Sequence, residues 1–267
     1  MMHRFFYAVI SAFVLFLNGC GQSETPKGAQ EDKPELLIYC GITMAHPIKA
    51  IAKIIEKEQN VTIKISQGGS EDLYTSLNAS RKGDIYLPGS ASYRKRHLAE
   101  GLLGDFVHVG YNQAAMMVPK GNPQGLKADL ANLARKDLAV VICNPDSGSI
   151  GRESKKMLQK FGNFDAVMDN ASNLTTDSRN MNKALKQGEA DIIINWRATG
   201  FFPENSSLID VLDLDPKYAK PKKLLLNLLT FSKHPEVAKR FMEYAASPEG
   251  QAIFRQYGFI DNTKKFE

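Results

Sequence analysis

The fold is decided by residues 36–77, LLIYCGITMAHPIKAIAKIIEKEQNVTIKISQGGSEDLYTSL. The first five residues form a short apolar run that ends at Gly41, as expected for a buried strand. A helix follows, with Thr43 as its expected N-cap and Pro47 in its first turn, where a missing N–H costs little. Apolar residues then recur at the helical spacing i, i+3, i+4 and i+7, namely Ile48, Ile51, Ala52 and Ile55.

Residues 61–65 alternate in hydropathy like a strand, and a second helix is expected directly after Gly68, Gly69 and Ser70. The same alternation of strand and helix patterns continues along the chain, which predicts an α/β protein with mixed, mainly parallel sheets flanked by helices. Further runs that we interpret as strands are residues 83–87, 114–118, 138–143, 192–194 and 224–231. Two helices close the chain, and Ser247 caps the second of them.

The composition argues against several classes of protein. The length of 267 residues suits one large domain or two modest ones, and a net charge of +5 without a long Lys/Arg block argues against nucleic-acid binding. Three Cys are too few for a disulfide-dense scaffold or a four-Cys zinc site, and the five His form no metal motif. Because no nucleophile elbow or phosphate-binding glycine loop is evident, we expect no catalytic activity, no cofactor and no metal.

The N-terminus has the pattern of a secretory signal. Residues 5–17 are a run of thirteen residues, all apolar or aromatic except Ser11, which is short for a membrane-spanning helix of about 20 residues. The run ends in LNGC, residues 17–20, which resembles the bacterial lipobox whose Cys receives a lipid. We therefore expect a lipoprotein signal peptide at residues 1–19, lipidation of Cys20 and a flexible polar tether at residues 20–34. The alternative is an uncleaved anchor with an ordinary Cys, and both place the body outside the cytoplasm and tied to a membrane.

Three strand ends lead into small or hydroxyl residues immediately before a helix. These segments are residues 40–43, 68–70 and 147–151. Helix N-termini offer unpaired N–H groups and a positive dipole end, and ligands gather at the carboxyl ends of strands in open α/β sheets. Together the three segments can bind one dehydrated oxyanion through neutral donors. The alternative is that Thr43, Ser70 and Ser149 are simply N-caps.

The order of these segments resembles that of type II periplasmic solute-binding proteins, closest to the molybdate/tungstate-binding branch of ABC transporters. The resemblance runs from residue 36 to residue 259. Besides residues 36–77, it rests on four motifs: GDIYLPGS (83–90), NPDSGSIGRESKKML (144–158), RNMNKALKQGEADIIINWRAT (179–199) and the tail HPEVAKRFMEYAASPEGQAIFRQYGF (234–259).

The resemblance implies a set of ligand contacts. Carried onto this chain, they are Thr43, Gly69, Ser70, Ser149, Ile150, Asn180, Met181 and Trp196. Trp196 stands where the family has Tyr, so its indole can donate one hydrogen bond but accept none. Glu71 and Asp72 would repel an anion unless they turn outward. Three arginines that flank the second-lobe motifs are either additional anion contacts or surface residues, namely Arg152, Arg179 and Arg197.

The resemblance also implies two lobes with the ligand in the cleft between them. We expect one lobe to comprise residues 35–115 and 232–267 and the other residues 116–231, with crossings near 111–118 and 224–231. The chain would then be a lipid-anchored monomer that captures a small molybdate- or tungstate-like oxyanion and delivers it to an ABC transporter permease. The alternatives are another anion (sulfate, phosphate, a phosphorylated acid or a small carboxylate) or a surface sensor or adhesin with the same fold.

Cys40 and Cys143 end strands in different predicted lobes. A disulfide between them would join the lobes and impede a hinge. We therefore expect two buried free thiols that pack like small apolar side chains, with a cross-link or redox site as the alternative.

Overall fold

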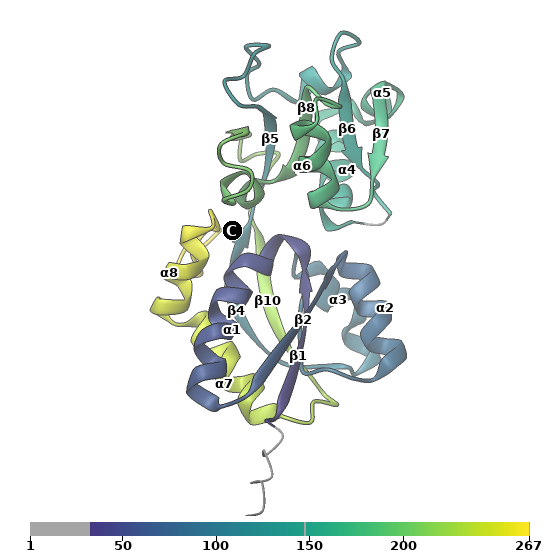
Figure 1. Cartoon of the computed structure of the whole chain (residues 1–267). Coiled ribbons are helices and arrows are strands. Elements are labelled where there is room, and N and C mark those ends of the chain that lie inside the picture. Colours follow the sequence, from purple (N-terminus) through teal and green to yellow (C-terminus); the bar gives the residue numbers. More distant parts are fainter. Residues whose placement is uncertain (1–32, 147, 267) are drawn as a thin grey trace, which may run out of the picture. The chain divides into compact units, whose positions relative to one another are not determined.

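The computed structural model describes residues 33–146 and 148–266, so the predicted signal peptide and Cys20 lie outside the described residues. Residues Lys33–Glu267 form one compact unit. It contains two five-stranded sheets, each flanked by helices (Figure 1). We call each sheet with its helices a lobe, and the two-lobed, mixed α/β architecture predicted from the sequence is confirmed.

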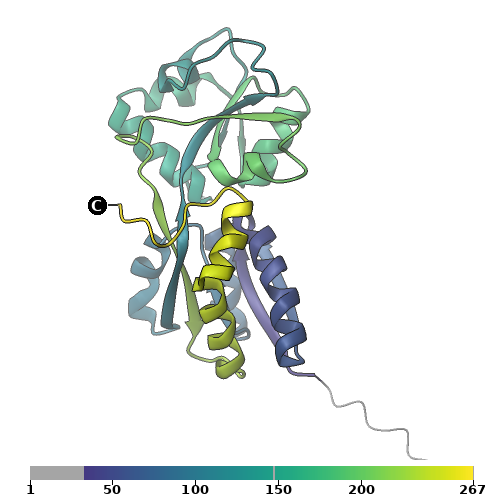
Figure 2. The same ribbon diagram turned by 90° about the vertical axis from the view of Figure 1, so that its left-hand side faces the viewer.

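The first lobe is an α/β/α sandwich. Its strands are β1 (Glu35–Gly41), β2 (Thr62–Gly68), β3 (Ile85–Leu87), β4 (Leu103–Asn112) and β10 (Lys222–Leu229), in the order β2-β1-β3-β10-β4. One face is covered by α1 (Ala45–Gln59), α7 (Pro235–Ala246) and α8 (Pro248–Gln256), which lie side by side in Figure 2. The other face is covered by α2 (Ser70–Ser80) and α3 (Ser92–His97).

The predicted apolar stripe of α1 is the face that it buries. Its four periodic residues are all buried in the first-lobe core, namely Ile48, Ile51, Ala52 and Ile55. Thr43, however, is not the N-cap of this helix. It lies in a short 3-10 turn, η1 (Ile42–Met44), that continues into α1, because the chain already turns after Gly41.

The second lobe repeats the arrangement. Its strands are β5 (Ala114–Pro119), β6 (Val140–Cys143), β7 (Ala171–Thr175), β8 (Ile192–Trp196) and β9 (Ile209–Leu212), in the order β7-β6-β8-β5-β9. Its helices are α4 (Ser149–Phe161), α5 (Phe164–Asn170) and α6 (Ser178–Lys186), with 3-10 turns η3 (Leu130–Ala134) and η4 (Arg197–Phe201). Met157 and Leu158 of α4 and the strands of the sheet share one core.

Two segments of chain connect the lobes. The first crossing lies at Gln113, between β4 in the first sheet and β5 in the second, within the predicted range 111–118. The second crossing comes earlier than predicted, over residues 213–221. The apolar run that we placed in the second crossing forms β10, which pairs with β3 and β4. Each sheet has two parallel and two antiparallel pairings, because the crossing strands run against their neighbours.

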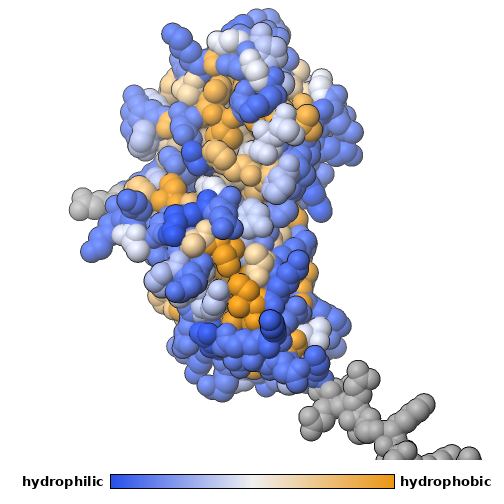
Figure 3. All heavy atoms as spheres, turned by 60° about the vertical axis from the view of Figure 1, so that its left-hand side comes forward, coloured by the Kyte–Doolittle hydropathy of each residue, from blue (hydrophilic) through white to orange (hydrophobic). Residues whose placement is uncertain are grey.

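The surface of the described part of the chain is mainly polar. On the face in Figure 3, hydrophilic side chains dominate and hydrophobic ones gather in a band on each lobe. Among the described residues, no helix has the length and hydropathy that crossing a membrane requires. Nor do His, Cys, Asp and Glu side chains gather in a possible metal-binding group within residues 33–146 and 148–266.

Cys40 and Cys143 are both buried and free, as predicted. The Cys40 thiol donates a weak hydrogen bond to the carbonyl oxygen of Gly41, at 3.4 Å. Burial raises the pKa of Cys40 well above its usual value and that of Cys143 to about 12. Because the thiolate is the reactive form, both thiols are expected to be inert in the folded protein.

This inertness can be measured in a Cys20→Ser variant, which leaves Cys40 and Cys143 as the only thiols. We expect no reaction with a chromogenic disulfide reagent at pH 8 in the native state, and release of two equivalents after unfolding in guanidinium. Rapid reaction of either thiol in the native protein would contradict the burial described here.

Candidate ligand-binding site

A small cavity lies where the two lobes meet. Its volume is about 20 Å³, on the order of the space that one water requires. Residues 41–43, 68–70 and 89 line it from the first lobe, and residues 148–150 and 176–178 line it from the second. The structure therefore brings together five of the predicted ligand contacts: Thr43, Gly69, Ser70, Ser149 and Ile150.

Two helices begin at this cavity without a side-chain cap. The N-cap of α2 is Gly69 and the N-cap of α4 is Gly148, and neither helix has a side-chain cap hydrogen bond. Ser70 and Ser149 are the first helical residues, so the interpretation of these two serines as N-caps is wrong. Because the first N–H groups of a helix lack intrahelical partners, both helix starts can donate hydrogen bonds to an anion.

The turn after β3 completes the first-lobe side of the cavity. The Gly89 N–H donates to Ser70 Oγ at 3.0 Å, and Asn112 Nδ2 donates to the Gly89 carbonyl oxygen at 3.2 Å. The Ser70 carbonyl oxygen accepts from the buried Tyr86 hydroxyl at 2.7 Å. These bonds fix the start of α2 against the end of β3.

Trp196 positions Ser149 on the second-lobe side. Its Nε1 donates to Ser149 Oγ at 3.1 Å, and only 1% of Trp196 is exposed. A Cβ atom at Gly89 would lie 2.4 Å from Ser149 Oγ, so the two lobes touch here. Trp196 thus acts on the cavity through Ser149. Sequence reasoning missed Gly89, although its place in the small-residue turn after a strand was the available signal.

The start of α6 differs from those of α2 and α4 because a carboxylate occupies it. Asp177 Oδ1 accepts from the N–H groups of Arg179 and Asn180 at 2.8 and 2.9 Å, and the Met181 N–H donates to the Asp177 carbonyl oxygen at 3.2 Å. Neither Asn180, which is exposed, nor Met181, which is in the core, lines the cavity. The N–H groups that the resemblance assigns to the ligand are therefore already bonded.

Asp177 also changes the electrostatics of the cavity, which it lines beside Thr176 and Ser178. Two like unit charges 4 Å apart repel by about 4 kcal/mol at an effective dielectric constant of 20. A fully ionised anion in the cavity would be repelled by the carboxylate, and Arg179, whose Nη2 lies 4.0 Å from Asp177 Oδ2, reduces this repulsion.

All three predicted arginines lie near acidic partners, and the contact of Arg179 is the longest, with Nη2 4.0 Å from Asp177 Oδ2. Arg197 Nε lies 2.7 Å from Asp213 Oδ1, away from the cavity. Arg152 Nη2 lies 3.6 Å from Glu71 Oε2, and the guanidinium stacks over Tyr93 at 4.5 Å, so this arginine joins the lobes.

The repulsion of a bound anion that we predicted for the acidic residues of α2 is offset. Glu71 binds Arg96 at 2.8 Å in addition to Arg152, so its charge is compensated. Asp72 is exposed and does not line the cavity, in agreement with the expectation that it turns outward.

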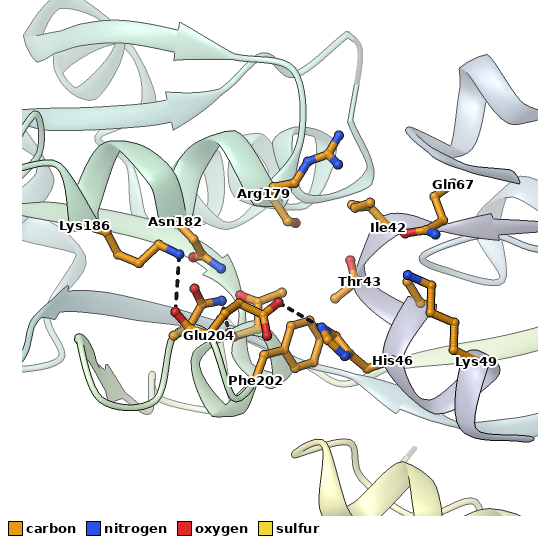
Figure 4. Close-up of a pocket in the computed structure, with 14 residues that line it drawn as sticks. Ile42, Thr43, His46, Lys49, Gln67, Arg179, Asn182, Lys186, Phe202 and Glu204 are labelled. Carbon is orange, nitrogen blue, oxygen red and sulfur yellow. Dashed lines mark hydrogen bonds and ion pairs between the residues drawn. The ribbon is translucent and has the colours of Figure 1, made fainter. Parts of the chain in front are cut away.

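A larger pocket of about 370 Å³ adjoins the small cavity, and both share Ile42, Thr43 and Ser178 as walls. Figure 4 shows that α1 and β2 contribute first-lobe residues and that α6 and the segment after η4 contribute second-lobe residues. Its cationic and polar side chains include Lys49, Gln67, Arg179, Asn182, Lys186 and Asn205.

The lobes are also connected at this pocket by His46 and Glu204. His46 Nε2 lies 2.8 Å from Glu204 Oε1, and the imidazole stacks on Tyr257 with ring centroids 5.4 Å apart. Burial raises the pKa of Glu204, but hydrogen bonds from a backbone N–H and from His46 outweigh this, so the pKa lies below its ordinary value.

Comparison with known proteins agrees with this geometry. Residues 36–260 match the family described as bacterial extracellular solute-binding protein. The chain belongs to this family. Its sequence is 22% identical to the molybdate-binding protein of Rhodobacter capsulatus, over 85% of this chain and 88% of that protein.

Two solved structures show the same fold. The molybdate-binding protein of Azotobacter vinelandii matches with a TM-score of 0.73 and 14% identity, over 84% of this chain and 98% of that one. The L-phospholactate-bound PEB3 structure matches with a TM-score of 0.68 and 18% identity, over 85% of this chain and all of that one (100%). The chain is therefore a solute-binding protein of a family that acts outside the cytoplasm, with the type II periplasmic-binding fold.

Gly89 offers a direct test of the contact between the lobes. We expect Gly89→Ala to weaken the binding of phosphate or molybdate at least tenfold, because the new Cβ would meet Ser149 Oγ at 2.4 Å when the lobes close. Gly104→Ala is the matched control, since Gly104 does not line the cavity and its Cβ would lie 3.4 Å from the Leu228 carbonyl oxygen, an ordinary contact. Calorimetric titration measures both variants, and equal affinities would contradict the proposed contact.

The ion pair of Glu204 predicts a pH dependence. A carboxyl group whose pKa is lower in the folded chain than in the unfolded chain stabilises the folded state at pH values above its ordinary pKa of about 4.3. This contribution is lost as the pH falls through the lowered pKa of the folded state. We therefore expect Glu204→Gln to be less stable than the wild type at pH 7, with the difference shrinking to nothing near pH 3. Urea unfolding at several pH values measures it.

The control for this experiment is Glu236→Gln, because 87% of the Glu236 side chain is exposed and its contact with Lys239 is long, at 3.8 Å. This variant should differ little from the wild type at any pH. A Glu204→Gln deficit that remains constant from pH 7 to pH 3 would argue against the pair.

Proposed function

We propose that the chain captures the oxyanion group of a small ligand in the small cavity and delivers the ligand to an ABC transporter permease. In this arrangement of the lobes the cavity offers about 20 Å³, the space of about one water, so the lobes must separate to admit the anion and close around it less tightly than they do here. The observation that carries this proposal is the meeting of two uncapped helix starts, from α2 and α4, in a cavity formed by both lobes. The hydroxyls of Thr43, Ser70 and Ser149 add donors without adding charge. Neutral, preorganised donors suit an anion that has shed its water.

The relatives support an oxyanion as the ligand class. Two of the compared proteins are named for molybdate, and the third is bound to L-phospholactate, whose phosphoryl group is also tetrahedral. We infer an oxyanion of the molybdate, tungstate, sulfate, phosphate or phosphorylated-acid type. A carboxylate has two oxygens rather than four and would use fewer of the donors that line the cavity.

Closure of the lobes would couple binding to delivery. A ligand that contacts both lobes favours the closed state by the difference between its affinities for the closed and open states. The crossings at Gln113 and residues 213–221 are the segments that can act as the hinge. We propose that the permease recognises the closed arrangement.

We further propose that Cys20 carries a lipid that holds the protein, as a monomer, at the membrane. Tethering raises the effective concentration of the carrier near its permease. Stable anchoring requires more than one acyl chain, as bacterial lipoproteins provide.

A thermal-shift experiment with molybdate, tungstate, sulfate, phosphate and phospholactate tests the oxyanion proposal. A ligand that binds only the folded state stabilises it by about 2.7 kcal/mol at a hundred times its Kd, so we expect a clear shift with at least one of them. Ser70→Ala should weaken this binding about tenfold, because it removes one donor from the cavity. Ser76→Ala, on the exposed face of the same helix, should not.

Two outcomes would count against the proposal. One is the absence of any shift in folded protein at millimolar concentrations of every anion. The other is binding that is equally strong in the Ser70→Ala and Ser76→Ala variants, which would place the anion elsewhere.

A further inference from the structure

We propose that the ligand is a phosphate monoester whose organic part carries a second anionic group and a hydroxyl. Its phosphoryl group would occupy the small cavity and its organic part the larger pocket. The inference rests on the proposed oxyanion-binding function of the small cavity. Three observations carry it: the carboxylate in the cavity, the adjoining pocket, and the unused polar groups of that pocket.

Asp177 selects the kind of oxyanion. Its carboxylate lines the small cavity, with only 15% of the side chain exposed, and an ionised carboxylate can only accept hydrogen bonds. Sulfate and molybdate are fully deprotonated at neutral pH and bring only acceptors, so they meet Asp177 as a like charge. A phosphate monoester has a second pKa of about 6, so about one molecule in ten still carries a proton at pH 7. This monoanion can bind and donate its proton to Asp177 at about a tenfold loss of affinity, whereas sulfate has no such form near neutral pH.

The adjoining pocket indicates that the ligand extends beyond its oxyanion group. The small cavity has about 20 Å³ of free space, whereas the neighbouring pocket has about 370 Å³. Because Ile42, Thr43 and Ser178 line both, a substituent on a bound phosphoryl group would enter the larger pocket directly. A bare tetrahedral anion would leave that pocket to solvent.

The charges of the larger pocket favour a second anionic group. Lys49 projects from α1 and has no ion pair among the described residues, and Arg179 and Lys186 reach the pocket from α6 (Figure 4). The carboxylate of Glu204 is the acidic group on this wall, and it is already paired with His46 at 2.8 Å. Arg179 lies 4.0 Å from Asp177 Oδ2, and Lys186 donates to the Glu204 carbonyl oxygen at 3.3 Å. Lys49 is therefore the cation on this wall that a second anionic group would reach without a competing contact among the described residues.

Asn205 indicates the position of a hydroxyl. Only 4% of this residue is exposed, and its Nδ2 donates to the Thr199 carbonyl oxygen at 2.7 Å. Its Oδ1 is buried and has no hydrogen-bond partner in the described part of the chain. A buried acceptor without a donor is costly, and Asn205 lines the larger pocket, so a ligand hydroxyl there would satisfy it.

Calorimetric titration of the whole lipid-free chain with four probes tests the proposal: sulfate, inorganic phosphate, phospholactate and 2-phosphoglycerate. The last two both carry a carboxylate and differ by one hydroxyl. We expect phosphate to bind at least tenfold more tightly than sulfate, phospholactate at least tenfold more tightly than phosphate, and 2-phosphoglycerate most tightly.

Two variants assign these differences to residues. Asp177→Asn retains an acceptor for the α6 cap but removes the charge, so sulfate affinity should rise to within threefold of phosphate affinity. Lys49→Gln should weaken phospholactate and 2-phosphoglycerate about tenfold and leave phosphate unchanged. Lys53→Gln, one turn further along α1 and outside the pocket, is its control.

The outcomes separate this inference from the proposed function. If phosphate binds in a Ser70-dependent manner but sulfate binds equally well, or the esters bind no more tightly than phosphate, the inference is overturned and the oxyanion site stands. If none of the four probes binds folded protein, both fail. Should Asp177→Asn not fold, the order of the four affinities in the wild type and the Lys49→Gln result decide the matter.

Discussion

The site depends on how closely the two lobes approach at Gly89 and Ser149. A side chain at position 89 would meet the second lobe, because a Cβ at Gly89 would lie 2.4 Å from Ser149 Oγ and 3.1 Å from Ser149 Cβ. Gly151 in the second lobe must also lack a side chain, because a Cβ there would lie 2.1 Å from the Asn144 carbonyl oxygen. Small residues at these positions bring the start of α4 against the end of β6 and opposite the start of α2. The two uncapped helix starts can therefore face the same small cavity. This cavity lies at the carboxyl ends of the strands, where open α/β sheets bind their ligands.

The contacts that join the lobes on either side of this cavity are of two kinds. Arg152 and Glu71 form a polar contact on one side, and His46 and Glu204 form another on the other side. Contacts with this exposure each contribute about 0–1 kcal/mol, so they align the lobes without fixing them closed. Near His46 there is also apolar packing, because Phe202 of the second lobe is buried in the first-lobe core and its ring lies 4.5 Å from His46. A ligand that contacts both lobes would add to these contacts and so favour the closed arrangement.

The sequence predicted the structure best where the pattern involves residues close together in the chain. The helical spacing of Ile48, Ile51 and Ile55 predicts the buried face of α1, and the small residues after two strands indicate the starts of α2 and α4. It was least informative where the partner lies far along the chain. The apolar run of β10 predicts a strand but not its sheet, because only pairing with β3 and β4 decides that. The partners of Arg152 and Arg197, and the contact of Gly89 with Ser149, are likewise set by tertiary structure. The family resemblance placed donors at Asn180 and Met181, but it did not register the carboxylate of Asp177, which occupies that helix start.

This substitution of a carboxylate for free donors divides recognition into two parts. In the small cavity, selectivity comes from hydrogen-bond direction, because the cavity contains hydroxyls, N–H groups and one acceptor-only carboxylate. In the larger pocket, the proposed attraction is by charge and rests on Lys49, because Arg179 also contacts Asp177 and Lys186 is bonded to the Glu204 carbonyl oxygen. Under the proposed binding mode, a fold shared with molybdate-binding proteins would take a different ligand without moving a strand. The differences that this would require are local: the side-chain cap of Asp177 at the start of α6, and Lys49 without an ion pair among the described residues of the neighbouring pocket.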